Sequence, residues 1–185
     1  MKLAIFFVFA AVILRLLPHM PNFTPVTAIA LFGGAYLSRR LAIILPLLII
    51  IISDYLMLYI GPFGTGFNKF HGLGEMFYST ILFVWGCFVI SSLIGIWIGK
   101  KKTVGRVTFG AILASLQFFI ITNFGVWLVD NFYPHNLDGL IQSYVMGIPF
   151  YRGTFLGDLF YTGLIFGGYE LIIYYSKKLQ LTQKI

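Results

Sequence analysis

Two ionisable side chains interrupt otherwise apolar stretches of this sequence, where a charged residue rarely occurs by chance. Asp54 follows the run Ile51-Ile52-Ser53, and Arg15 lies near the end of the first apolar stretch. An ionisable group in so apolar a segment is costly, so it indicates a functional site by default. Asp54 is either such a site or a helix-end carboxylate that reaches interfacial water or pairs with Arg15. Arg15 in turn either contacts a ligand or extends to lipid headgroups.

Arg152 and His71 suggest two further kinds of recognition. The planar guanidinium of Arg152 suits a carboxylate or phosphate ligand, or else it pairs with Asp158 and fixes its loop. His71 is a metal or cofactor ligand, a hydrogen-bond donor or an interfacial residue. The three histidines have no close spacing, so a metal site is not predicted, and the cofactor is unknown. Asp54 and His71 could serve as an acid/base pair, but no nucleophile motif accompanies them, so we expect a non-enzyme.

The composition shows which elements must position these groups. The chain has 185 residues, of which 59% are hydrophobic and 10% charged, and its mean hydropathy is +0.91. Soluble domains carry about 25% charged residues, so this chain is predicted to be an integral membrane protein that does not bind nucleic acid. A membrane span needs about 20 residues, which leaves room for about six spans and no soluble catalytic domain. The single cysteine, Cys87, excludes an intramolecular disulfide.

The apolar runs predict an all-α, integral membrane six-helix bundle in a single transmembrane domain. We expect helices over residues 3–17, 24–38, 41–60, 76–99, 104–129 and 154–175, with outer loops at 18–23, 61–75 and 130–153. Small residues recur at four-residue spacing and allow either close internal packing or a partner-binding face. These pairs are Ala30/Gly34, Gly95/Gly99, Gly153/Gly157 and Gly163/Gly167.

The basic residues predict the orientation of the bundle. With both termini inside (N-in, C-in), ten of the thirteen lysines and arginines fall on the inner side, as the positive-inside rule requires. The other three are Arg15, Lys69 and Arg152. All histidines and nearly all carboxylates then fall at or near the outer side, where aromatic residues are also abundant. This asymmetry indicates that a small molecule is captured from outside.

Several longer motifs resemble a widespread, poorly characterised bacterial membrane-protein family. They include residues 15–26 (RLLPHMPNFTPV), residues 30–36 (ALFGGAY), Ser53-Asp54 and residues 148–152 (IPFYR). Further matches are Phe70-His71 with Tyr78 seven residues later, Thr122-Asn123 with Trp127, Tyr133-Pro134 and Gly139-Leu140. That family is similar to the substrate-binding (S) components of energy-coupling factor (ECF) vitamin transporters, and the resemblance covers most of the chain.

The resemblance implies a site, a ligand class and partners. S components have six helices with both termini inside, lie in the bacterial cytoplasmic (inner) membrane, and bind a vitamin near the outer face. They dock on a coupling protein with two ATPases through Ala-x-x-x-Ala in the first helix, a spacing that is absent here. Solitary cobalamin-binding members suggest cobalamin as one possible ligand. The substrate-binding residues implied are Arg15, Asp54, His71, Tyr78, Asn123, Trp127, Arg152 and Asp158. A membrane assembly protein without a small-molecule ligand remains the other alternative.

Overall fold

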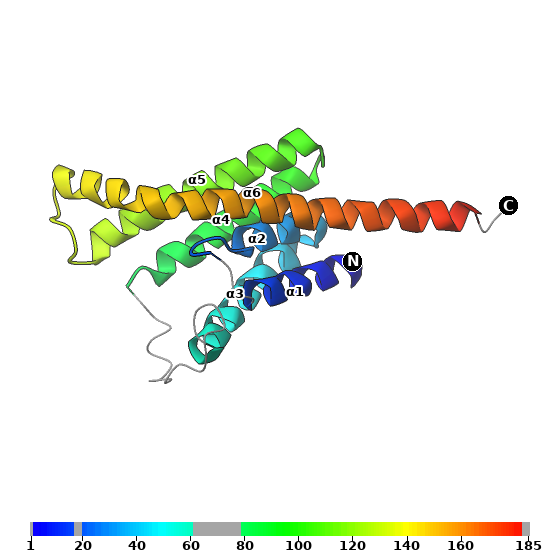
Figure 1. Ribbon diagram of the computed structural model, residues 1–185, viewed down its shortest axis with the longest axis horizontal. Coiled ribbons are helices and arrows are strands. Elements are labelled where there is room, and N and C mark those ends of the chain that lie inside the picture. Colours follow the sequence, from blue (N-terminus) through cyan, green and yellow to red (C-terminus); the bar gives the residue numbers. More distant parts are fainter. Residues whose placement is uncertain (1, 17–19, 61–78, 183–185) are drawn as a thin grey trace.

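The computed structural model describes residues 2–16, 20–60 and 79–182, and these residues form six helices and no strand (Figure 1). The helices are α1 (Lys2–Leu16), α2 (Val26–Tyr36), α3 (Arg39–Ile60), α4 (Ile81–Gly99), α5 (Val104–Val129) and α6 (Leu137–Thr182). The prediction of an all-helical chain with six helices is confirmed for this part of the molecule. α1 and α5 have nearly the predicted bounds, whereas α2 is shorter at both ends.

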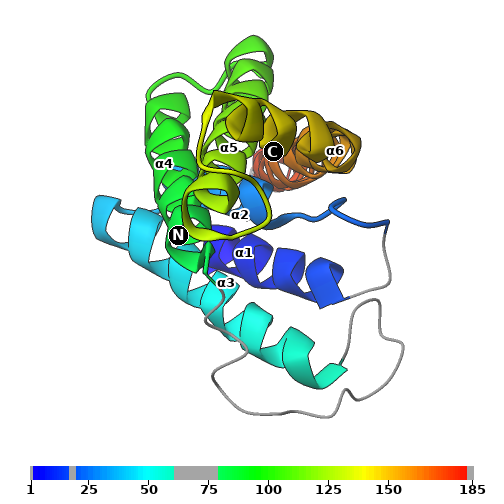
Figure 2. The same cartoon turned by 90° about the vertical axis from the view of Figure 1, so that its left-hand side faces the viewer.

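The short helix α2 forms the centre of the bundle. Its residues from Val26 to Ala35 are all buried, and it packs against each of the other five helices (Figures 1 and 2). A helix that is apolar on all sides is stable only inside such a bundle. With 11 residues, α2 is about 16 Å long. The central helix α2 is therefore much shorter than most of the helices that pack around it.

Glycines explain how closely α2 approaches α4. A Cβ atom added to Gly34 would overlap the Ser92 carbonyl oxygen and lie 2.8 Å from the Gly95 Cα atom. A Cβ on Gly99 would lie 2.9 Å from the carbonyl oxygen of Ala35. Two of the predicted small-residue pairs thus serve internal packing between these helices, the first of the two roles that their spacing allows.

The last helix is longer than the sequence predicted. α6 has 46 residues and is about 69 Å long at 1.5 Å per residue. The predicted outer loop over residues 130–153 is therefore wrong from Leu137 onward, and Pro149 lies inside a helix instead of a loop. In Figure 1, the C-terminal part of α6 extends beyond the rest of the bundle.

Contacts with α5 explain why this segment is helical. The Ser143 hydroxyl donates to the Asn123 carbonyl at 3.3 Å, and the Tyr144 hydroxyl donates to the Ile120 carbonyl at 3.0 Å. The two helices lie side by side along this stretch (Figures 1 and 2). Packing against a neighbouring helix thus makes helical a segment whose polar and aromatic composition predicted a loop.

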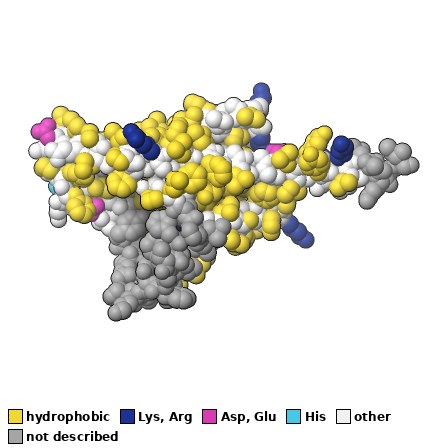
Figure 3. Space-filling model, in the orientation of Figure 1, with side chains coloured by type: hydrophobic (Ala, Val, Ile, Leu, Met, Phe, Trp, Pro, Cys, Tyr) yellow, Lys and Arg dark blue, Asp and Glu magenta, His cyan; other side chains and the backbone are white. Residues whose placement is uncertain are grey.

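The surface has the character expected in a bilayer. Hydrophobic side chains cover most of the described face in Figure 3, and Leu82, Leu113 and Leu164 are among the exposed ones. Of the described helices, α4, α5 and α6 are long and apolar enough to cross a membrane. Below, the Arg15 end is the end of the bundle where α1 ends and α4 begins. The Lys100 end is the opposite one.

Candidate functional site

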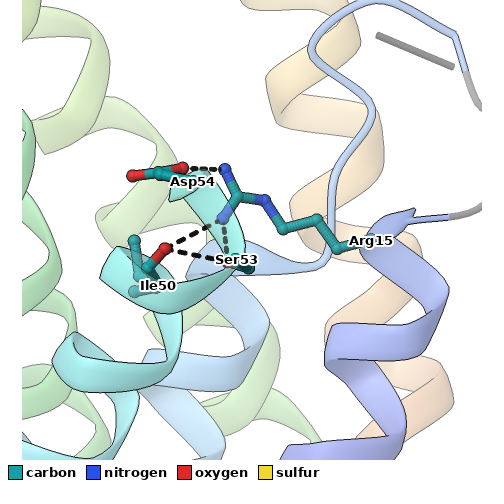
Figure 4. A network of polar contacts seen from close by, with 4 residues as sticks. All are labelled: Arg15, Ile50, Ser53 and Asp54. Atoms are coloured by element: carbon teal, nitrogen blue, oxygen red, sulfur yellow. Dashed lines mark hydrogen bonds and ion pairs between the residues drawn. The ribbon is translucent and has the colours of Figure 1, made fainter. Parts of the chain in front are cut away.

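Arg15 and Asp54 form an ion pair at the Arg15 end of the bundle (Figure 4). Nη2 of Arg15 contacts Oδ1 of Asp54, while Nη1 donates to the Ser53 hydroxyl and, at 3.3 Å, to the Ile50 carbonyl. Ser53 also donates to that carbonyl at 2.8 Å. Both charged side chains are partly buried, at 14% and 23% exposure. The pairing foreseen as one alternative from the sequence is therefore present.

The ion pair faces a cavity of about 260 Å³, here named the Arg15 cavity. Polar groups of α1, the segment before α2, α2 itself, α3 and α6 converge on it. Apolar side chains of α4 and α5 close the other side. Its lining is Arg15, Asn22, Thr24, Val26, Thr27, Asp54, Val84, Phe88, Phe118 and Thr154. A few polar groups within an apolar wall are typical of small-molecule sites.

A second cavity of about 290 Å³, the Asn123 cavity, adjoins the first and shares three lining residues with it. Asn123 donates from Nδ2 to the Phe119 carbonyl at 2.8 Å. Gly147 on α6 leaves space for the amide, since a Cβ there would lie 2.9 Å from Nδ2. The lining is Asn22, Phe118, Phe119, Thr122, Asn123, Gly147, Phe150, Tyr151 and Thr154. Arg15, Asp54 and Asn123 thus line two adjoining cavities, which together form one candidate site.

Two other predicted residues lie away from these cavities. Trp127 donates from Nε1 to the Pro134 carbonyl at 3.1 Å, and its ring packs against His135. It therefore fixes the turn between α5 and α6. Arg152 is exposed and lines none of the cavities described here. The described residues show no ion pair between Arg152 and Asp158.

Asp158 lies in the interior of the bundle, and its predicted position near the outer end of a helix is wrong. The prediction counted from a helix beginning at Thr154, whereas α6 begins at Leu137, so Asp158 lies about six turns into the helix. Its side chain is 2% exposed and lines neither of the two cavities at the Arg15 end. Its surroundings differ from those of the other site residues.

A groove of about 250 Å³ lies at the Lys100 end, between α5 and α6, and is here named the Lys102 groove. The Tyr36 hydroxyl donates to Glu170, and the Lys102 ammonium lies 4.9 Å from the centre of the Tyr36 ring. The groove is lined by Tyr36, Lys102, Thr103, Val104, Val107, Thr108, Ala111, Leu159, Thr162, Gly163, Phe166, Gly167 and Glu170. The bundle therefore has polar openings at both ends.

His71 and Tyr78 lie outside the residues that the structure describes. The acid/base pair of Asp54 and His71 and any ligand contact of Tyr78 therefore stay predictions. Among the described residues, no group of three histidine, cysteine or carboxylate side chains could hold a metal ion.

The sequence profile of one protein family, described as a family of unknown function (DUF6580), matches residues 1–181. The chain belongs to the DUF6580 family. No curated protein and no solved structure matches it. The candidate site of this DUF6580 member is therefore defined by its own residues alone.

Sequence reasoning missed several residues that line the cavities of this DUF6580 chain. Asn22 borders both cavities and has a φ of 60°, a left-handed conformation that asparagine adopts more readily than most residues. The segment around it rests on glycines of α6, because a Cβ on Gly157 would lie 3.0 Å from the Phe23 Cα atom. Phe118 and Thr122 share a face of α5 at four-residue spacing, which was the available signal.

Proposed function

We propose that this protein is a membrane substrate-binding or transport protein, similar to ECF S components, that captures a small molecule at the Arg15 end. The observation that carries the proposal is the Arg15–Asp54 pair on the wall of a cavity, with the Asn123 amide next to it. A paired guanidinium and carboxylate can each exchange their mutual contact for a ligand group of opposite charge.

The proposed orientation places the Arg15 end outside and both termini inside a bacterial cytoplasmic membrane, with all six helices embedded. The support is the charge distribution, since Lys2, Arg39 and the run 100–102 all lie at the Lys100 end. The helices that are too short to span alone, such as α2, are covered by longer neighbours.

The cavity sizes favour a compact ligand. Volumes of about 260 and 290 Å³ are close to the lower limit of about 300 Å³ for small-molecule pockets. We therefore propose a small zwitterion or a carboxylate-bearing vitamin rather than a cobalamin-sized molecule. The carboxylate of such a ligand would contact Arg15, and a cationic or hydroxyl group would contact Asp54.

Ligand-resolved native mass spectrometry tests the proposal. The protein is released from mild detergent as isolated and after incubation with a vitamin panel that includes small carboxylates and cobalamins. We expect one bound ligand, whose own mass is unchanged by binding. This ligand should be absent from the Arg15→Ala and Asp54→Ala variants. Arg152→Ala is the matched control because it removes an arginine that lines neither cavity. An adduct that survives both cavity variants would refute this site, and chemical conversion of the ligand would indicate an enzyme.

The alternative role in membrane assembly has one specific observation in its favour. A Cβ added at Gly163 or Gly167 meets no described atom within 4 Å. By contrast, Ala4 and Ala11 of α1 are buried in the core and are not available to a partner. An ECF-type coupling protein, or any other helical partner, would therefore dock on α6. We expect Gly163→Leu with Gly167→Leu to abolish co-purification of such a partner without lowering the thermal stability.

A further inference from the structure

A buried polar cluster lies between the two openings of the bundle. It consists of Asp158 and Thr162 on α6, Ser115 on α5 and Thr27 on α2, each at most 4% exposed. The hydroxyl groups of Thr27 and Ser115 lie beside the Asp158 carboxyl group. Oδ2 of Asp158 and the hydroxyl oxygens of Ser115 and Thr162 have no hydrogen-bond partner in the described part of the chain. Buried polar atoms without partners are rare and need a physical reason.

The outermost members of the cluster reach the two openings. Thr27 lines the Arg15 cavity, and Thr162 lines the Lys102 groove. Asp158 lies one helical turn from Thr162 at four-residue spacing, and Ser115 lies one turn from the groove residue Ala111. A single carboxyl group therefore separates a hydroxyl at one opening from a hydroxyl at the other.

The surroundings of Asp158 favour its neutral form. The groups that face it are the hydroxyls on α2 and α5, and no lysine, arginine, histidine or second carboxylate among the described residues pairs with it. An ionised carboxylate without a cation is very costly to bury in a membrane protein. Asp158 lines none of the three cavities, so a proton, which needs no volume, fits this position better than a metal cation.

We propose that Asp158 is an exchangeable proton-binding site between the Arg15 cavity and the Lys102 groove. The carboxylate takes a proton from hydronium in water at one opening and forms an O–H bond at Oδ2. It returns the proton to water at the other opening, so no further reactant is needed. Thr27 and Thr162 are positioning residues that relay the proton on either side. Use of this proton to drive ligand uptake rests on the proposed function, whereas proton binding itself does not.

Infrared difference spectroscopy of the full chain in lipid nanodiscs tests the proposal without any ligand. We expect a carbonyl band from a buried carboxylic acid that disappears at high pH, shifts in D₂O, and is absent from Asp158→Asn. Asp138→Asn is the matched control, since it removes an exposed carboxyl from the same helix. A band that is missing from the unmodified protein, persists in Asp158→Asn or ignores pH would overturn the proposal.

Two further measurements keep the test decisive if Asp158→Asn does not fold. Labelling with [¹³C]aspartate shifts the band of the unmodified protein and assigns it to an aspartate, and Asp54→Asn, Asp130→Asn and Asp138→Asn variants that keep the band leave Asp158 as its source. The double variant Thr27→Val/Thr162→Val preserves side-chain shape and should slow deuterium exchange of the band several-fold while leaving the fold intact, whereas either single variant leaves one side open. An exchange rate unchanged in the double variant would show that the hydroxyls are structural and that the connection between the openings does not exist. Native mass spectrometry reports separately on ligand capture.

Discussion

Two regions of this bundle hold an aspartate in opposite surroundings. At the Arg15 end, Asp54 is paired with a guanidinium that also bonds to Ser53 and a backbone carbonyl. In the interior, Asp158 faces hydroxyl groups and no cation in the described part of the chain. An ionised carboxylate is stable in the first region, whereas the second favours a neutral acid. The role of each aspartate thus follows from its neighbours on other helices.

Replacing each aspartate by lysine should show the largest difference between the two regions. Asp158→Lys places an ammonium at a position that is 2% exposed and has no carboxylate partner. We expect no folded protein, because an uncompensated buried charge costs several kcal/mol. Asp54→Lys retains access to cavity water and should fold with a lowered melting temperature. Size-exclusion chromatography and thermal unfolding in detergent measure both, and equal recovery of the two variants would contradict the contrast.

Removal of one partner tests the ion pair itself. Breaking a fully buried pair costs about 3–5 kcal/mol, but these side chains are 14% and 23% exposed and partly screened by water. We expect Arg15→Ala to lower the free energy of unfolding by about 1–2 kcal/mol. The double variant Arg15→Ala/Asp54→Ala should recover part of that loss. Strictly additive losses in this cycle would mean that the two charges are not coupled.

Neutralisation without a change of shape sharpens the comparison. Asp158→Asn keeps a polar group beside Thr27, and if Asp158 carries the proposed proton, this variant should stay within about 0.5 kcal/mol of the unmodified free energy of unfolding. Asp54→Asn should lower the free energy of unfolding by about 1 kcal/mol. Added salt should make this loss smaller, because it screens the Arg15–Asp54 pair in the unmodified protein. Thermal unfolding at low and high salt distinguishes the two. A larger loss in Asp158→Asn than in Asp54→Asn would contradict the contrast between the two regions.

The smallest effect is expected at Arg152. Its side chain is exposed and forms no ion pair with Asp158 in the described residues. We expect Arg152→Ala to change the free energy of unfolding by no more than about 0.5 kcal/mol, as is usual for surface positions. Thermal unfolding measures this change. A substantially larger loss of stability would reveal that Arg152 makes a contact like those in the Asp54 region.

The helices could be predicted from the sequence wherever apolar runs end at charged or turn residues. The limits of α5, for example, follow from Thr103, whose side chain accepts from the Arg106 amide, and from Asp130 at the other end. The first part of α6 could not be predicted, because its polar and aromatic composition is typical of a loop. What makes it helical is its contact with α5, and such tertiary contacts are absent from a single sequence.

The site was predictable in part for the same reason. Arg15 and Asp54 stand out because charges are rare in apolar segments, and the structure brings them together. Phe118 and Thr154 line both cavities but have ordinary residue types. Only the packing of α5 beside α6 gives them that position. The error at Asp158 came from the helix start, since a shift of 17 residues moves a side chain from an end to the middle.

The shortness of α2 has an electrical consequence. Thr27 near its start lines the Arg15 cavity, while Tyr36 at its end and Thr162 of α6 line the Lys102 groove, so the barrier between the openings is at most as thick as α2 is long, about 16 Å. In the proposed orientation, water in the two openings would confine the fall of the membrane voltage to this layer, which is at most about half of the 30 Å hydrocarbon thickness. A unit charge carried past α2 would cross the whole potential, worth about 2.3 kcal/mol per 100 mV. The field strength inside this layer would then be at least about twice that in the surrounding lipid.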